Sequence, residues 1–189
     1  SFYLTTKNNL NPILADTEND AAVFSLIYDS LIYLEKDLSI TPQLAKSCTV
    51  SSDSSSISFA LRDDVFWHDG EKFTAEDVKY TIETIKSTGA GCIYYDSLSA
   101  VSSVEIVDDY NFTLTLTGPY ARIVNYLDFP IIPAHNFSIN ESPMGTGKYK
   151  FAENHQSGGM ILIMTYGNAG TNVAELQIFK EAGSFVSRC

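Results

Sequence analysis

The three histidines are the residues of this sequence best suited to bind a metal ion or to transfer a proton. His68, His135 and His155 lie far apart in the chain. None of them has a second histidine or a cysteine at the i+4 or C-x-x-C spacings that metal sites use. We therefore expect no metal site, no cofactor and no catalytic histidine.

Two other patterns typical of enzymes are incomplete. The segment Gly145–Lys148 has two glycines like those of a phosphate-binding loop, but the Lys-Ser/Thr ending and the remaining glycine spacing are missing. A tight turn is expected there instead. No Gly-x-Ser-x-Gly motif indicates a serine nucleophile. We predict that the chain is not an enzyme.

The charge balance excludes a further class of function. Among 189 residues, 12 Lys and Arg stand against 23 Asp and Glu, which gives a net charge of −11. Phosphate backbones and anionic lipid repel such a chain, so we expect no nucleic-acid partner. With 44% hydrophobic residues the chain can bury a core. Its densest apolar run, residues 21–34, contains Ser25, Asp29 and Ser30 and is too short and polar to span a membrane.

The hydrophobic periodicity predicts two helices and one short helical turn. Residues 17–33 carry apolar side chains at helical spacing. Residues 74–86 form the clearest helix, with Thr74 as N-cap and Asp77 in the capping-box position. A turn of helix is expected over residues 41–46, because proline is tolerated in a first helical turn.

Alternating apolar and polar residues predict the strands. One strand covers residues 57–61, and residues 104–116 are expected to form a hairpin. Between them, residues 65–73 form an aromatic corner in which Asp69 and Gly70 supply the turn. Three later strands are expected at residues 149–151, 160–165 and 176–179. Together these elements predict an α+β fold with a mixed sheet.

Two groups of residues could contact a ligand, and each also has a structural interpretation. Asp16, Thr17 and Glu18 fit the acidic cap of a helix as well as they fit ligand contact. Tyr94 and Tyr95 lie in a loop between two glycine-ended elements, where they could cover the core or line a cleft. The local sequence leaves both alternatives open.

Five motifs are spread over most of the chain. The most specific runs from Phe66 to Tyr80 and fits the pattern W-x-D-G-x-x-[FVL]-[TS]-A-x-D-V-x-[YF]. The others are Leu10-Asn11-Pro12, Pro42-Gln43-Leu44-Ala45, Val107–Thr113 and Pro143–Tyr149. In this order they resemble the motifs of family 5 extracellular solute-binding proteins, the receptors of peptide and nickel ABC importers. The resemblance implies structural roles for Trp67, Asp69, Gly70, Thr74, Asp77, Gly145 and Gly147.

The resemblance implies the fold of a type II periplasmic-binding protein, in which a ligand lies between two lobes that close over it. Family members are much longer than 189 residues, so this chain is expected to be their N-terminal portion. One lobe would comprise residues 1–35 and 140–189, and a smaller one residues 36–139. The opposing ligand-binding lobe would lie outside the chain.

The resemblance also implies a function and a partner. The full-length protein is expected to capture oligopeptides or dipeptides, or nickel or another small solute, by lobe closure and to deliver them to an ABC transporter permease. It is expected to be monomeric, extracellular or periplasmic, and lipid-anchored to the cell membrane. A ligand-sensing domain of a regulatory protein with the same fold is the alternative. The cleft residues that the resemblance implies are Asp16, Thr17, Glu18, Tyr94, Tyr95, Asp128 and Phe129.

Overall fold

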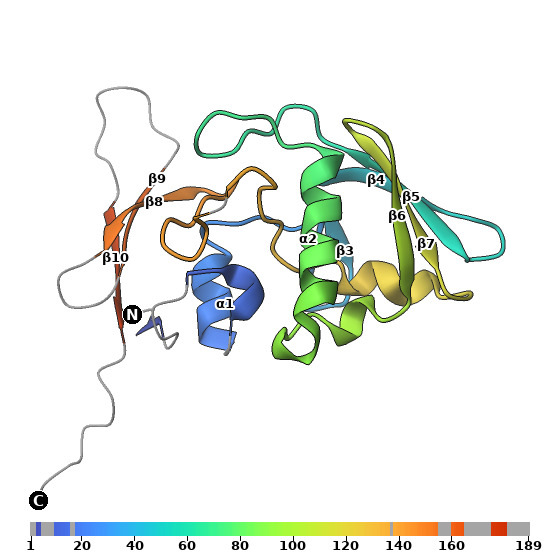
Figure 1. The fold of residues 1–189 in the computed structure, drawn as a ribbon, viewed down its shortest axis with the longest axis horizontal. Helices are drawn as coiled ribbons and strands as arrows, with labels where there is room; N and C mark the ends of the chain where they lie inside the picture. Colours follow the sequence, from blue (N-terminus) through green and yellow to red (C-terminus); the bar gives the residue numbers. More distant parts are fainter. Residues whose placement is uncertain are drawn as a thin grey trace, which may run out of the picture.

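The computed structural model describes residues 3–4, 10–15, 18–136, 138–154, 160–164 and 175–180. Within these residues, two four-stranded sheets, one two-stranded sheet and two α-helices form the predicted α+β fold. Short 3-10 helices lie at Pro12–Leu14, Gly89–Gly91, Asp96–Leu98 and Ala121–Tyr126. The two larger sheets lie at opposite ends of the molecule, with both α-helices between them (Figure 1).

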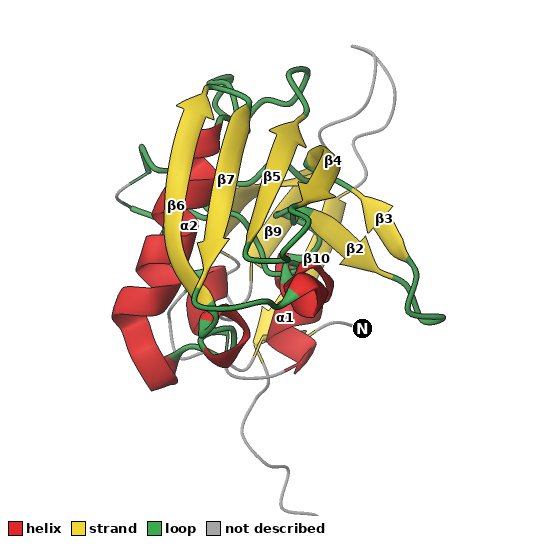
Figure 2. Cartoon of the chain, turned by 90° about the vertical axis from the view of Figure 1, so that its right-hand side faces the viewer, coloured by secondary structure: helices red, strands yellow, loops and turns green. Residues whose placement is uncertain are grey.

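The first large sheet is antiparallel throughout. It consists of β4 (Ala45–Val50), β5 (Ser56–Leu61), β7 (Asn111–Leu116) and β6 (Val101–Asp108), in that order. The rings of Phe59 and Phe112 stack on its inner face with 4.9 Å between centroids. Helix α2 (Ala75–Thr88) packs against one face of this sheet (Figure 2). The predicted strand at residues 57–61 and the hairpin at residues 104–116 are confirmed.

The second large sheet joins segments from near the two ends of the chain. Its strands are β1 (Tyr3–Leu4), β10 (Glu175–Lys180), β9 (Met160–Met164) and β8 (Tyr149–Asn154), in that order. Strand β1 runs parallel to β10, with Tyr3 opposite Phe179, and the other pairs are antiparallel. The sheet is therefore mixed, and the three late strands form where they were predicted.

Helix α1 is shorter than predicted. It covers Glu18–Phe24 instead of residues 17–33, and the chain then turns and enters β2 (Ile32–Leu34). Just before β2, the buried hydroxyl of Ser30 lies 2.7 Å from the amide oxygen of Gln43. A hydrogen bond from Ser30 to Gln43, thirteen residues further along the chain, thus forms where a further turn of helix is predicted.

The predicted helical turn at residues 41–46 is wrong. Strand β3 (Ile40–Pro42) pairs with β2, with Pro42 opposite Ile32, and β4 begins at Ala45. Proline is compatible with this position because a two-stranded sheet has an outer edge that needs no N–H donor. Pairing with β2, rather than local preference, decides the conformation here.

The aromatic corner and the start of α2 form as predicted. Gly70 has a φ of 95°, a conformation that favours glycine, and its N–H donates to the carbonyl of Trp67 at 2.9 Å. The Trp67 side chain is only 2% exposed, and its indole N–H donates to Asp77 at 3.2 Å. The same carboxylate accepts the N–H of Thr74 at 2.9 Å, which is the capping-box bond at the start of α2.

A glycine-rich segment packs directly against the turn that follows α1. The N–H of Gly147 donates to the carbonyl of Ile27 at 2.8 Å. His68 contacts the same segment: its Nδ1 accepts the N–H of Gly145 at 3.3 Å, and its Nε2 lies 2.9 Å from the carbonyl of Gly147. Both bonds form together only when the imidazole is neutral and carries its proton on Nε2. His68 therefore has a structural role.

We expect the variant His68→Ala to show that this role depends on pH. Burial lowers the pKa of His68, and the Lys150 ammonium acts in the same direction. The folded chain thus binds this proton less readily than the unfolded chain does. The contribution of His68 is fully present above the unfolded pKa of about 6.5 and is lost as the pH falls from there through the lower pKa of the folded state.

Urea unfolding should show that His68→Ala loses about 1–2 kcal/mol near pH 7.5 and less near pH 5. The variant His68→Gln, whose amide can also accept and donate, should reduce the pH dependence while keeping more of the stability. An equal loss for His68→Ala at both pH values would contradict the assigned protonation state.

Candidate functional site

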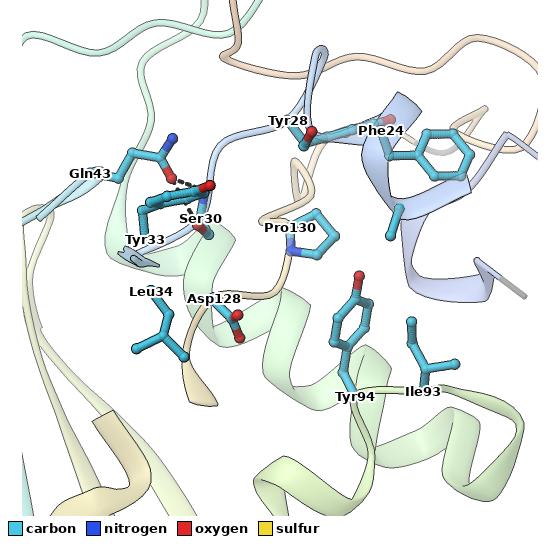
Figure 3. Close-up of a pocket in the computed structure, with 12 residues that line it drawn as sticks. Phe24, Tyr28, Ser30, Tyr33, Leu34, Gln43, Ile93, Tyr94, Asp128 and Pro130 are labelled. Carbon is cyan, nitrogen blue, oxygen red and sulfur yellow. Dashed lines mark hydrogen bonds between the residues drawn. The ribbon is translucent and has the colours of Figure 1, made fainter. Parts of the chain in front are cut away.

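A cavity of about 600 Å³ opens between α1, the β2–β3 hairpin and two loops from later in the chain (Figure 3). Its volume lies in the range of sites for small molecules. It is lined by Ala21, Phe24, Ser25, Tyr28, Ser30, Tyr33, Leu34, Gln43, Ile93, Tyr94, Asp128 and Pro130. Aromatic and aliphatic side chains form most of the wall, with polar groups at its two ends.

Helix α1 and the turn after it form one wall. Ala21, Phe24, Ser25 and Tyr28 recur at the spacing of one helical face. Phe24 and Tyr28 are buried, and their rings meet edge to face with 6.3 Å between centroids. The Tyr28 hydroxyl accepts the N–H of Met144 at 3.1 Å, and burial raises the pKa of this phenol. The described side chains of this wall carry no charge.

A network of polar side chains occupies the end beside the β2–β3 hairpin. The amide oxygen of Gln43 accepts the N–H of Ser30 at 2.9 Å, and its amide nitrogen donates to Asp29 at 3.1 Å. Thr146 donates its hydroxyl to the same carboxylate at 2.9 Å. Burial raises the pKa of Asp29, against the opposing effects of Thr146 and of nearby cationic side chains. Gln43 is thus engaged within the protein at both ends of its amide.

Tyr94 and Asp128 also line the cavity and come from two different loops (Figure 3). The ring of Tyr94 packs against Phe129 with 6.1 Å between centroids. Burial, together with the negative charge of Asp128, raises the pKa of Tyr94 to about 12. Asp128 is exposed at the rim, yet the surrounding protein raises the pKa of its carboxyl as well. The carboxylate of Asp128 therefore acts on the phenol of Tyr94 within the cavity.

Two of the predicted ligand contacts, Tyr94 and Asp128, are among the residues that line the cavity. Phe129 is fully buried behind Tyr94 and has no surface in the cavity. Tyr95 is 37% exposed and does not line it. Phe129 therefore supports the site from behind, and Tyr95 flanks it.

The remaining predicted ligand contacts lie in the acidic segment, residues 16–18. Asp16 and Thr17 lie outside the described residues, and Glu18 begins α1.

Sequence reasoning missed the cavity roles of Tyr28 and Gln43. Gln43 belongs to the Pro-x-Leu-Ala motif, so the motif was a signal for its segment but not for its contact with Ser30.

The motif residues with structural roles lie away from the cavity. The residues that line the cavity include none of them, that is, none of Trp67, Asp69, Gly70, Thr74, Asp77, Gly145 and Gly147. An oxygen of the Asp69 carboxylate lies 2.8 Å from Nε2 of His135, within hydrogen-bond distance. Partial burial acts to raise the pKa of Asp69, but the N–H of Glu71 and the imidazole of His135 together keep it below its usual value.

Two features are absent from the part of the chain that the structure describes. There, no three His, Cys, Asp or Glu side chains come close enough together to hold a metal ion. No helix of this part is long and apolar enough to cross a membrane.

A family model decides the family of the chain. The model for the middle region of bacterial extracellular solute-binding proteins, family 5, matches residues 39–163, well over half of the chain. The chain belongs to this family. The resemblance carried by the five motifs is thereby confirmed. The matched stretch of this family 5 chain contains the aromatic corner, α2, Tyr94 and Asp128.

Relatives of this family 5 chain are named as binding proteins, in agreement with the prediction that it is not an enzyme. The glutathione-binding protein GsiB of Pectobacterium atrosepticum is 29% identical over an alignment of 161 residues that covers 81% of this chain and 31% of the relative. A putative ABC transporter peptide-binding protein of Brucella ovis is 29% identical over 158 residues, 77% of this chain and 30% of the relative. The chain thus spans about a third of the length of these relatives.

Solved structures confirm the type II periplasmic-binding-protein fold. NikZ from Campylobacter jejuni, in complex with Ni(L-His), is 30% identical with a TM-score of 0.79 over 94% of this chain and 38% of its own. NikA from Brucella suis, in complex with Fe(III)-EDTA, is 26% identical with a TM-score of 0.77 over the same shares. The oligopeptide-binding protein AppA from Bacillus subtilis, with a nonapeptide, has a TM-score of 0.75 at 23% identity, over 87% of this chain and 35% of its own, and shares the fold alone.

Proposed function

We propose that the full-length protein containing this chain is the substrate-binding receptor of an ABC importer. It captures a dipeptide or oligopeptide, or another small solute such as a nickel chelate, and delivers it chemically unchanged to a membrane permease. The observation that carries the proposal is the largely apolar cavity of about 600 Å³. Support comes from relatives that are named for binding glutathione and peptides.

Capture by lobe closure is consistent with the exposed side chains around the cavity. Tyr33 is 53% exposed and Ile93 is 54% exposed, so apolar surface at the cavity faces solvent. We assign residues 1–35 and 140–189 to one lobe and residues 36–139 to a smaller one. An opposing lobe from outside this chain covers the cavity when a ligand binds and removes this surface from water.

The proposed receptor works outside the cytoplasm, in keeping with the extracellular family to which the chain belongs. It acts as a monomer, and a lipid anchor holds the full-length protein at the cell membrane beside its permease. Cell fractionation tests this location, because an anchored receptor requires detergent for release from the membrane.

Calorimetry tests the binding function. We expect the full-length protein to bind at least one of three probes: a dipeptide mixture, glutathione or Ni(L-His). The 189-residue chain alone should bind the same probe at least about 100-fold more weakly, because much of the enclosing surface is missing. Tight binding by the chain alone would contradict capture between lobes. No binding of any probe by the full-length protein would contradict the proposed function.

A further inference from the structure

A segment without regular secondary structure carries part of the cavity wall. Residues 128–134 form neither a helix nor a strand. Asp128 and Pro130 line the cavity (Figure 3), and Phe129 is buried behind Tyr94. Such a segment has no ladder of backbone hydrogen bonds of its own, so its position depends on the groups that accept its N–H donors.

Few donors are available to anchor this segment. Between residues 130 and 134, Pro130 and Pro133 have no backbone N–H, so only three donors remain. One of them, the N–H of Ile131, donates to the carbonyl of Asp29 at 3.0 Å. One side of the segment is thus anchored to the turn that follows α1.

The other two donors are bound by side chains of α2. The N–H of Ile132 donates to the Thr81 hydroxyl at 3.0 Å, and the N–H of Ala134 donates to the Asp77 carboxylate at 2.8 Å. Thr81 is fully buried, and its hydroxyl oxygen lies 2.7 Å from the carbonyl oxygen of Asp77 and 3.2 Å from that of Ile132. Helix α2 therefore anchors the segment at two positions, which lie one turn apart on the same face of the helix.

The Thr81 hydroxyl is the anchor that can be removed with the least change of shape. Valine resembles threonine in shape but has no hydroxyl, so Thr81→Val leaves the N–H of Ile132 unpaired in the core. The segment must shift for this N–H to find another acceptor. Pro130 lies two residues before Ile132 and Asp128 lies four before it, so the shift reaches the cavity wall.

On the basis of the proposed function, we infer that Thr81 is a positioning residue for solute capture. Thr81 does not line the cavity. It fixes Ile132 and thereby holds Asp128 and Pro130 in place in the wall that a solute contacts. The affinity of the receptor then depends on a hydroxyl group of α2 that lies in the core, outside the cavity.

The test uses variants of the full-length protein that separate the hydroxyl from the rest of the side chain. Thr81→Val removes the hydroxyl, Thr81→Cys replaces it by a thiol, which is a weak acceptor, and Thr81→Ser keeps it and removes the methyl group. The control is Thr88→Val, because the Thr88 hydroxyl donates at 2.8 Å to the carbonyl of Thr84 within the same helix.

Three measurements are made at a temperature at which every variant is folded or, for the first, on heating from it. Thermal unfolding reports stability. Hydrogen exchange, followed by mass spectrometry without a ligand, reports the protection of residues 128–134. Calorimetry reports the affinity for the probe that the parent protein binds most tightly among a dipeptide mixture, glutathione and Ni(L-His).

We expect Thr81→Val and Thr81→Ser both to lower the midpoint of thermal unfolding, because one loses a buried hydrogen bond and the other a buried methyl group. Only the hydroxyl should matter for binding. Exchange of residues 128–134 should accelerate about 10-fold or more and affinity should fall about 5-fold or more in Thr81→Val, with a smaller effect in Thr81→Cys. Thr81→Ser and Thr88→Val should stay within about 2-fold of the parent in both measurements.

The outcomes separate this inference from the receptor function. Unchanged affinity or unchanged exchange in Thr81→Val, or in Thr81→Cys if the valine variant does not fold, would overturn the inference and leave the receptor function intact. An equal loss of affinity in Thr81→Ser would do the same, because the loss would then follow stability and not the hydroxyl. Binding of no probe by the parent protein would overturn both.

Discussion

Replacement of Gly145 by alanine is expected to destabilise the folded chain by about 3 kcal/mol or more. A Cβ atom built on Gly145 would lie only 1.9 Å from the carbonyl oxygen of Ile27 and 2.6 Å from its carbonyl carbon. Both are backbone atoms, and the oxygen also accepts the N–H of Gly147, so it cannot move without breaking that bond. This loss is a large part of the total free energy of unfolding, which is about 5–15 kcal/mol for a typical domain.

The effect of Gly145→Ala is measured by urea unfolding followed through the fluorescence of Trp67, the one tryptophan of the chain. Gly118→Ala is the matched control, since a Cβ there meets nothing within 4 Å and no positive φ is involved. The control should stay within about 1 kcal/mol of the parent. Equal stability of both variants would show that the contact with Ile27 does not require glycine.

Replacement of Asp77 by alanine is expected to cost about 3 kcal/mol or more as well, for an electrostatic reason instead of a steric one. Asp77 is 4% exposed, and its carboxylate accepts the indole N–H of Trp67 and the N–H groups of Thr74 and Ala134, at 3.2, 2.9 and 2.8 Å. Alanine leaves these donors without their acceptor, and the indole N–H of Trp67 is then unpaired in the buried core.

Glu76→Ala is the control for Asp77→Ala, because Glu76 is exposed and lies in the same first turn of α2. It keeps the capping box and should change stability by less than about 1 kcal/mol. Trp67 fluorescence should also shift in Asp77→Ala, where the indole N–H has lost its partner. A loss as small as that of Glu76→Ala would mean that water replaces the carboxylate.

Local signals predicted the elements whose formation depends on nearby residues. Helix α2 carries its start signal in Thr74 and Asp77, and the Asp69-Gly70 turn needs no distant partner. The segment from residue 25 to residue 46 could not be predicted in this way. There, Pro42 pairs with Ile32, and such a pairing leaves no trace in local periodicity.

The residues of the candidate site also divide into those that the sequence predicted and those that depend on contacts between distant segments. Tyr94 and Asp128 were nominated because the family resemblance placed their loops at a cleft, and both line the cavity. The contributions of Tyr28, Ser30 and Gln43 depend on how α1 and the β2–β3 hairpin meet. No single segment of the sequence shows that α1 and the hairpin come into contact, so these residues are recognised only from the structure.

The parallel pairing of β1 with β10 sets an order in which the chain can fold. Tyr3 pairs with Phe179, about 176 residues further along, whereas every strand of the antiparallel sheet lies between Ala45 and Leu116. A long loop must close before β1 and β10 can meet, and contacts between residues so far apart in the sequence form slowly. The antiparallel sheet, whose contacts are more local, can therefore form first, and the sheet that contains β1 is completed after it.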